Sequence, residues 1–416
     1  MKKIGTLLLL LAFHSAVFSQ DCLPALKDYT TPFGTIEAGS FTFLQDQLKE
    51  VKIVGLGEDT HGTSEFTTLP TKMLQYLVEN HQFNLFIIEA GFGEVAYLND
   101  YVQGKADSLL PILNTRISTW RYRTTEFVEM MDWIRQYNKT HQRKVQLYGM
   151  EMQYVLGDLN RIKQYLAKAG PSTIDADFSK HLWQPIPDEE KGDYYIAYKK
   201  LKALFYKNRE QFIKQTGEEA FAEAYHHVEV IGQFISAIHQ QSDVLKNDFR
   251  DIYMAVNVEW ILQNNADDSR AFIWAQNVHL GDWVSNGITD VLGHQLKKRF
   301  GASFYNIATD FGTGEFIAFP HNANEIGWKL KTFSFEKVLP HTFTACLQKL
   351  GSPNLFLNLR KMKTIPSLKA EIEKDLTIMY GAGAQEWGRQ TETVPVGKAF
   401  DAIIYLEKTH KINFLR

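Results

Sequence analysis

Cysteine is scarce in this sequence, basic residues do not outnumber acidic ones, and no long apolar run follows the first 20 residues. Two cysteines among 416 residues exclude a cysteine-rich zinc or iron–sulfur site and a small disulfide-held scaffold. The chain has 45 Lys and Arg against 48 Asp and Glu, so it lacks the basic surplus of nucleic-acid-binding proteins, and we expect no nucleic-acid partner. A hydrophobic content of 44% excludes a disordered chain.

Residues 1–19 have the pattern of a secretory signal peptide. Two lysines precede an apolar run over residues 4–18, and Ser19 supplies a small residue for cleavage before Gln20. A histidine and a serine interrupt this run, which is shorter than the roughly 20 residues that a membrane-spanning helix needs. The sequence therefore predicts export to the periplasm or the medium, with no membrane attachment after cleavage.

Cys22 and Cys346 both remain in the chain after this cleavage. Exported proteins form disulfides readily, so these two cysteines could pair. They could equally stay as two unpaired thiols, because a sequence does not show whether two residues lie close together. Both alternatives stay open at this point.

Short apolar runs alternate with helical periodicity along the chain, which is typical of an α/β protein. Continuous apolar strands separated by helices favour a mostly parallel sheet that is flanked by helices on both faces. The expected strands are Val51–Gly57, Asn84–Ile88, Lys144–Tyr148, Ala271–Ala275, Ser303–Ala308, Asn354–Leu359 and Ala402–Leu406.

The pattern changes between about residues 188 and 264, where no convincing strand occurs. Periodic stretches predict about three helices there, over Tyr194–Ile213, Glu218–Gln240 and Val244–Leu262. We interpret residues 20–416 as one domain with an inserted all-helical subdomain at this place.

Acidic and imidazole side chains follow four of the expected strands. Glu58 and His61 follow the first strand, and Glu89 follows the second. The third strand is followed by Glu151, and the strand at 271–275 by Gln276 and His279. Ligands of parallel sheets bind at the carboxyl ends of the strands. Carboxylates that cluster there repel one another, so the sheet gains no stability from them and a function is the better explanation. The pattern therefore predicts a functional cleft at this edge.

Two arginines precede the helix expected at 126–137, and we select Arg123 as a substrate-binding residue that balances the charge of the nearby glutamates. Arg121 is the other arginine of this segment.

His61 is the best candidate for a general base, since the pKa of histidine lies near working pH. A carboxylate on its other ring nitrogen, from Glu58 or Glu89, would fix the tautomer. The sequence has no P-loop or His-Glu-x-x-His motif, and its lack of a Gly-x-Ser-x-Gly elbow argues against a serine hydrolase. The same His and Glu side chains could hold a divalent metal, although their spacing does not require one.

Several blocks of the sequence resemble the erythromycin esterase family. They occur in the order of the family, and they are Gly57–Phe66, Ile88–Gly91, Arg123–Phe127, Arg250–Asn257 and Trp274–His279. The resemblance implies an α/β fold with a helical insertion and hydrolysis of a macrolide lactone by a His-activated water, without an obligatory metal or other cofactor. It further implies that His61 is the base, that Glu58 and Glu89 are its partners, and that His279 is a second imidazole.

The family pattern at residues 274–279 is Trp-Ala-His-Asn-x-His. This chain departs from it at one position, where Gln276 replaces the first His. Glutamine donates hydrogen bonds but does not titrate. We therefore expect a small-molecule ester or lactone substrate, with Glu151 and Gln276 binding it and no metal ligand assigned. The alternatives are a metal-dependent hydrolase, an envelope-polysaccharide enzyme and a non-catalytic binding protein. The sequence makes no prediction of the oligomeric state.

Overall fold

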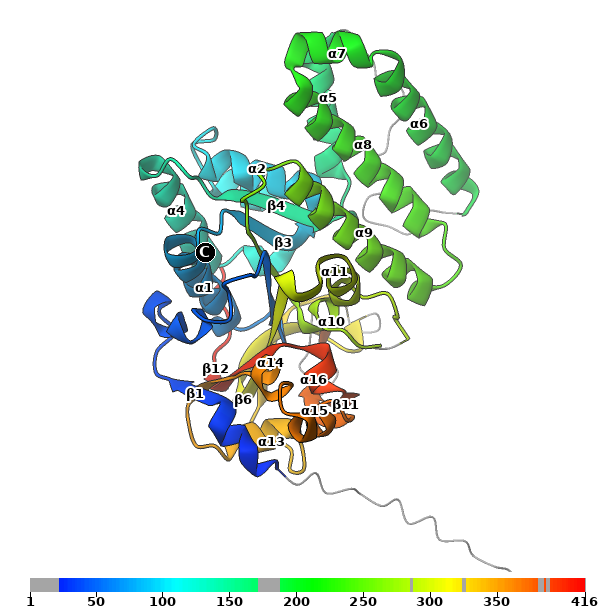
Figure 1. The fold of residues 1–416 in the computed structure, drawn as a ribbon. Helices are drawn as coiled ribbons and strands as arrows, with labels where there is room; N and C mark the ends of the chain where they lie inside the picture. The colour runs from blue at the N-terminus through cyan, green and yellow to red at the C-terminus, as the bar shows by residue number, and fades with distance from the viewer. Residues whose placement is uncertain are drawn as a thin grey trace, which may run out of the picture.

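The computed structural model describes residues 22–170, 188–284, 287–323, 327–380, 385–386 and 390–415. Its centre is a ten-stranded sheet with the order β1-β8-β12-β6-β2-β5-β3-β4, and β7 and β10 pair with β6 (Figure 1). The strands are β1 (Thr30–Phe33), β2 (Ile53–Glu58), β3 (Leu85–Gly91), β4 (Gln146–Glu151), β5 (Ala271–Gln276), β6 (Phe304–Pro320), β7 (Lys331–Phe335), β8 (Asn354–Leu357), β10 (Gln385–Glu386) and β12 (Ala402–Thr409). A separate two-stranded sheet pairs β9 (Leu376–Tyr380) with β11 (Gln390–Val394).

Helices cover both faces of the large sheet, as continuous apolar strands require. One face packs on α1 (Glu65–His81), α2 (Phe92–Val102), α4 (Thr125–Thr140) and η2 (Ala38–Leu44). The other face packs on α9 (Asp243–Gln263), α10 (Asn277–Leu280) and α11 (Leu292–Phe300), and near β8 and β12 on α13 (Phe343–Gln348), α14 (Leu359–Met362), α15 (Pro366–Ile372) and α16 (Val396–Ala399). Short elements η1 (Pro24–Tyr29), α3 (Leu110–Thr115), η3 (Trp120–Tyr122) and η5 (Gly301–Ser303) lie in the connections.

A block of helices between β4 and β5 projects from the sheet (Figure 1). It contains α5 (Leu156–Ala169), α6 (Asp188–Lys207), α7 (Arg209–Thr216) and α8 (Glu218–Ile238), which share an apolar core of their own. The helix expected at 194–213 is two helices, because Asn208 interrupts it and its side chain donates to the carbonyl of Leu204. The last helix, α9, also covers the sheet, so it belongs to both parts.

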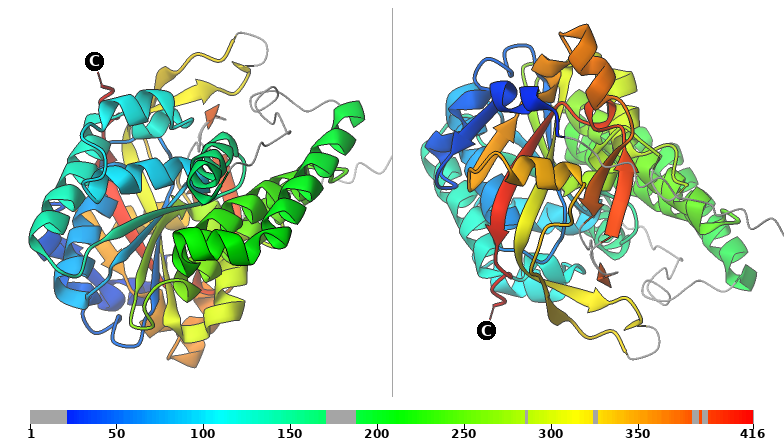
Figure 2. Two further views of the ribbon diagram at one scale, coloured as in Figure 1. Left: turned by 90° about the horizontal axis from the view of Figure 1, so that it is seen from above. Right: turned by 90° about the horizontal axis from the view of Figure 1, so that it is seen from below.

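All seven strands expected from the sequence are present, and the α/β class with a mostly parallel sheet is confirmed. β2, β5, β3 and β4 run parallel, whereas β8 is antiparallel to β12. β6 is longer than expected because its second half pairs with β7 in a hairpin. This hairpin projects from the sheet near the C-terminus of the chain (Figure 2).

Cys22 and Cys346 form a disulfide, which resolves the alternative that the sequence left open. The bond ties the chain beside η1 to the buried helix α13, 324 positions away in the sequence. The expected signal peptide lies outside the described residues. Among the helices that are described, none combines the length and the apolar character needed to cross a membrane.

Candidate active site

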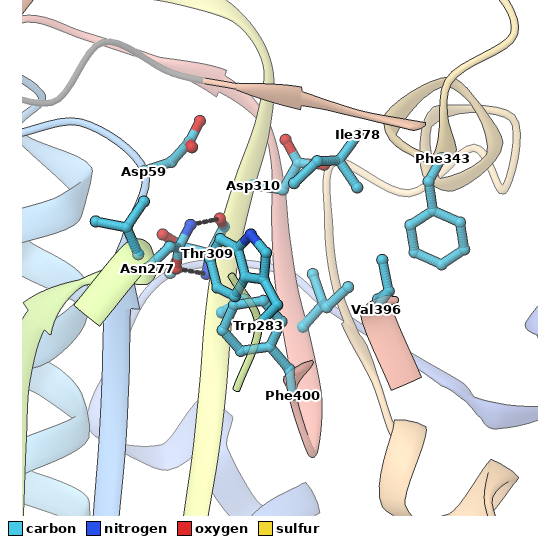
Figure 3. A pocket seen from close by; sticks show the side chains of 12 residues that line it. Asp59, Asn277, Trp283, Thr309, Asp310, Phe343, Ile378, Val396 and Phe400 are labelled. Carbon is cyan, nitrogen blue, oxygen red and sulfur yellow. Dashed lines mark hydrogen bonds between the residues drawn. The ribbon is translucent and has the colours of Figure 1, made fainter. Parts of the chain in front are cut away.

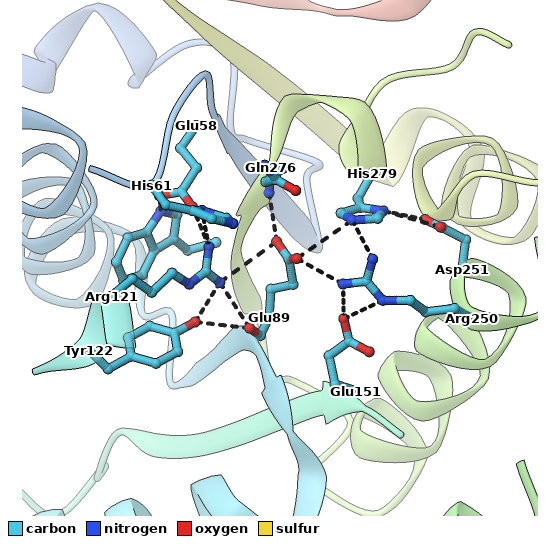
Figure 4. A network of polar contacts seen from close by, with 11 residues as sticks. Glu58, His61, Glu89, Arg121, Tyr122, Glu151, Arg250, Asp251, Gln276 and His279 are labelled. Atoms are coloured by element: carbon cyan, nitrogen blue, oxygen red, sulfur yellow. Dashed lines mark hydrogen bonds and ion pairs between the residues drawn. The ribbon is translucent and has the colours of Figure 1, made fainter. Parts of the chain in front are cut away.

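The carboxyl ends of four neighbouring parallel strands bring Glu58, Glu89, Glu151 and Gln276 together (Figure 4). Glu58 at the end of β2 pairs in register with Gln276 at the end of β5. Glu151 ends β4 opposite Gly91 of β3. The site is therefore located where the sequence predicted it, and it is built on strands rather than on loops alone.

His61 lies in the turn after β2, and its Nδ1 is 2.5 Å from Oε1 of Glu58. A carboxylate only accepts, whereas Arg121 Nη1, which only donates, lies 2.7 Å from the same Nδ1. We assign the proton to Nδ1 because the contact with Glu58 is the shorter of the two, and neutral His61 then keeps its lone pair on Nε2. No side chain among the described residues forms a hydrogen bond with Nε2. The indole of Trp274 donates to the other oxygen of Glu58 at 2.9 Å and fixes that carboxylate.

Glu89 occupies the centre of the network and is buried. Its Oε1 accepts from Arg250 at 2.9 Å, and its Oε2 accepts from the backbone N–H of Gln276 at 2.9 Å. Arg121 Nη2 lies 3.7 Å from Oε2. Burial alone raises the pKa of Glu89, but Arg121, His279 and Arg250 together lower it well below its ordinary value. Glu89 is therefore ionised at neutral pH, and it holds the two arginines rather than accepting protons.

His279 forms the second imidazole centre of the site. Its Nδ1 is 2.8 Å from Asp251 Oδ1, and its Nε2 lies 3.0 Å from Arg250 Nη1 and 3.5 Å from Glu89 Oε1. Burial lowers the pKa of His279 and Arg250 adds to this, but Asp251 and Glu89 outweigh both, so the pKa is raised. Each imidazole thus has one carboxylate on Nδ1 and one arginine close by, but Arg121 lies against Nδ1 of His61, whereas Arg250 lies against Nε2 of His279.

Arg121, not Arg123, is the arginine of this segment that enters the site. Its guanidinium donates to Glu58 and to the backbone carbonyl of Glu89, and it also contacts the hydroxyl of Tyr122. The guanidinium of Arg123 instead donates to the carbonyls of residues 113 and 117 and so holds the loop between α3 and η3. Our selection of Arg123 is corrected accordingly, since Arg121 lies within η3, Arg123 caps the end of η3, and the two side chains point in different directions.

Four further residues of the network were not selected from the sequence. Arg250 contacts both Glu89 and Glu151, and its Nε is 2.7 Å from Glu151 Oε1. The others are Asp251, Trp274 and Tyr122. Adjacent charged residues within the periodic helix at 244–262 could have indicated Arg250 and Asp251, because both interrupt a pattern that otherwise buries apolar residues.

Within the described ranges, no group of three or more His, Cys, Asp or Glu side chains has the arrangement of a metal site. At least one oxygen of each of Glu58, Glu89 and Glu151 contacts an arginine side chain. The chemistry that this arrangement supports is proton transfer by imidazole in a field of balanced charges.

The turn that carries His61 is clamped by two other segments of the chain. The carbonyl of Gly62 accepts from the N–H of Ile317 in β6 and from the N–H of Ile412, both at 3.1 Å. A Cβ at Gly62 would lie 1.9 Å from the carbonyl oxygen of Ile317, so only glycine fits between the turn and β6. The C-terminal segment, residues 410–415, therefore helps to position His61.

A small cavity, open in part to solvent, borders the same edge of the sheet (Figure 3). Its polar lining includes Asp59 and Asn277, which neighbour the site residues in sequence, and its apolar lining includes Trp283, Phe343 and Phe400.

Glu94, in the first turn of α2, is a buried acid close to the site. Its Oε1 accepts from the backbone N–H of Ser118 at 3.2 Å, and Oε2 has no hydrogen-bond partner among the described residues. Burial raises the pKa of Glu94 to about 7, with a further contribution from Asp158 and opposition from Ser118.

The sequence model of the erythromycin esterase family matches residues 78–409, a range that includes Glu89, Glu151 and His279 and begins after His61. The chain belongs to the erythromycin esterase family. Erythromycin esterase type II of Escherichia coli is 22% identical over 386 residues, which cover 80% of this chain and 90% of that protein. A putative hydrolase, YbfO of Bacillus subtilis, is 23% identical over 411 residues, covering 88% and 85% of the two chains.

Solved structures share the fold of this family member. A Bacillus cereus protein superposes with a TM-score of 0.80 at 22% identity, over 94% of this chain and 98% of that one. A mutant of the erythromycin esterase EreC in its open conformation gives 0.66 at 17% identity, over 91% and 98%. Family membership and the names of the relatives imply a hydrolase.

The contacts that hold the His61 turn against β6 can be tested by a substitution at Gly62. Gly62→Ala should displace His61, because the added Cβ meets the backbone of β6, which is less able to move than a flexible side chain. We expect a loss of about 2–4 kcal/mol in the free energy of unfolding, measured by urea denaturation. Gly39→Ala is the control, since nothing lies within 4 Å of a Cβ there, and an equal loss in both variants would contradict the clamp.

The buried acid Glu94 makes the stability of the family member depend on pH. Its folded pKa of about 7 exceeds the ordinary value of 4.5, so the folded chain holds a proton that the unfolded chain releases as pH rises through this window. Stability is therefore lost with rising pH, by about 3 kcal/mol in full. Glu94→Gln should remove this loss. The free energy of unfolding, measured by urea denaturation at pH 5 and pH 8, should therefore fall less between the two pH values in the variant than in the wild type. Glu129 is exposed, so Glu129→Gln is the control and should leave the pH dependence of stability unchanged. If Glu94→Gln also keeps the pH dependence of the wild type, Glu94 is not its cause.

Proposed function

We propose that this protein hydrolyses a carboxylic ester or lactone with a water molecule that His61 activates. The observation that carries the proposal is the contact between His61 Nδ1 and Glu58, which directs the lone pair of Nε2 away from the carboxylate. Relatives named erythromycin esterase support the same reaction class.

In this proposal His61 Nε2 takes a proton from water while the oxygen of that water attacks the carbonyl carbon. Glu58 stabilises the imidazolium that forms, as a carboxylate does in hydrolases with a His–carboxylate pair. The raised pKa of His279 favours its protonated form, which donates a proton to the leaving alkoxide when the C–O bond breaks. The products are an acid and an alcohol, or one hydroxy acid from a lactone.

Gln276 distinguishes this chain from the family pattern and bears on the choice of substrate. Its backbone N–H holds Glu89, so the position keeps its structural role, but an amide side chain cannot transfer a proton. We therefore propose an ester or lactone other than erythromycin as the main substrate. Glu151 stays within the site and fixes Arg250, which points to a positioning role rather than a direct contact with substrate.

We further propose that the protein is exported after cleavage before Gln20. The signal-like residues 1–19 and the Cys22–Cys346 disulfide both suit an oxidising compartment. N-terminal sequencing of the exported protein from its native host should give a start at or near Gln20. An intact Met1 in that fraction would contradict export by this route.

The catalytic assignment predicts a graded series of variants. His61→Ala should lower kcat on a turned-over ester by about 10²–10⁴-fold with the fold intact, and His61→Gln should not rescue it. Glu58→Gln should lower kcat less than His61→Ala, because the base remains while its orientation is lost. Initial rates on a panel of p-nitrophenyl esters, lactones and erythromycin provide the measurement, with circular dichroism to verify folding.

Arg121 and Arg123 supply a matched control for this series. Arg121→Lys should lower kcat by about tenfold, since lysine cannot bridge Glu58 and the Glu89 carbonyl, whereas Arg123→Lys should stay within about twofold of the wild type. Wild-type turnover in His61→Ala would remove His61 from the mechanism, and equal losses in the two arginine variants would remove Arg121 from it.

A further inference from the structure

Aromatic rings extend from His61 to the surface of the molecule. Trp120 of η3 lies 6.4 Å from the His61 ring, centroid to centroid, and Phe319 and Phe414 lie 6.2 and 6.1 Å from Trp120. Trp328 continues the series at 5.2 Å from Phe319. We call Trp120, Phe319, Trp328 and Phe414 the aromatic strip.

The outer part of the strip is open to solvent. The exposed fraction of Trp328 is 56% and that of Phe414 is 37%, while Trp120 and Phe319 are partly buried. Exposing large aromatic side chains costs solvation free energy, so a contiguous open series of rings next to a candidate base indicates a binding surface.

The strip is held in a fixed position relative to His61. Ile317 and Ile412 donate to the carbonyl of Gly62, beside His61, and each stands two residues before a phenylalanine of the strip, Phe319 and Phe414. The backbone contacts that position the base therefore also position these two rings. A ligand that binds the strip would be presented to His61 without rearrangement of the backbone.

We propose that the aromatic strip is a substrate subsite that takes a neutral, apolar, ring-bearing substituent of the ester. This inference rests on the proposed hydrolase function and adds its selectivity. None of the four side chains carries a charge, and their faces and edges suit apolar groups and other rings better than ions. The continuity of the strip with His61 favours the substrate as its occupant over a second protein molecule.

The test compares ethyl acetate, which carries no ring, with ethyl 4-phenylbutyrate, which carries a phenyl group on the acyl side, and with 4-phenylbutyl acetate, which carries it on the alcohol side. Trp328→Ala and Phe414→Ala should lower kcat/KM about five- to tenfold for an ester with the phenyl group, mainly through KM. For ethyl acetate, kcat/KM should stay within about twofold of the wild type. The phenylbutyrate and the phenylbutyl ester show whether the strip takes the acyl or the alcohol side.

Two control variants make the outcome specific. Tyr206→Ala removes an aromatic ring that is 81% exposed on α6 and outside the strip, so it should change kcat/KM for none of these esters. Phe343→Ala enlarges the cavity of Figure 3, which is the other apolar surface near the site. If Phe343→Ala alone abolishes the preference for the phenyl group, or if Trp328→Ala lowers kcat/KM equally for ethyl acetate and for both phenyl-bearing esters, the strip is not the subsite.

A binding measurement separates this inference from the proposed function. The N-ethylamide of 4-phenylbutyric acid resembles ethyl 4-phenylbutyrate and resists hydrolysis, so its Kd can be measured on any variant by calorimetry. A Kd raised about fivefold by Trp328→Ala and Phe414→Ala supports the strip even if the wild type hydrolyses none of the esters. An unchanged Kd overturns the assignment of the strip as a substrate subsite. The assignment also fails if the only effect of these variants is a loss of self-association, measured by sedimentation.

Discussion

The ion pairs of Glu89 with Arg121 and Arg250 join the two halves of the site. On one side Arg121 reaches Glu58 and His61, and on the other side Arg250 reaches Glu151 and His279. Several buried carboxylates at one sheet edge would repel one another, and the two guanidiniums offset that repulsion. Breaking a buried network of this kind by removing one partner leaves an uncompensated charge, which costs about 3–5 kcal/mol. The geometry of both imidazoles thus depends on one glutamate at the end of one strand.

The fold provides this arrangement through strand order. Because β2, β5, β3 and β4 are neighbours and run parallel, their last residues meet at one edge although they are spread over more than two hundred positions in the chain. The helix α9, which packs against the sheet, adds Arg250 and Asp251 to the site, so the helical block contributes directly to it. The C-terminal segment completes it by holding Gly62, and thereby the turn of His61, against β6.

The sequence predicted the strands and the edge on which the site stands, because buried parallel strands are short apolar runs and the residues after them are local in the sequence. It predicted Glu58, His61, Glu89 and His279 for the same reason. It could not distinguish Arg121 from Arg123, since direction in a 3₁₀ segment depends on tertiary packing. Likewise, the pairing of Arg250 with Glu151 joins residues 99 positions apart. The family blocks included Arg250, but a block does not show which of its residues face the cleft.

The account depends on the tautomer of His61, which can be observed without knowledge of the substrate. Nitrogen-15 NMR of protein labelled at histidine, with His61→Gln to assign the signal, reports which ring nitrogen carries the proton. The contact with Glu58 predicts that neutral His61 carries its proton on Nδ1, and that Glu58→Gln shifts the population toward the other tautomer. A neutral His61 with its proton on Nε2 in the wild-type protein would contradict the assignment of that nitrogen as the base.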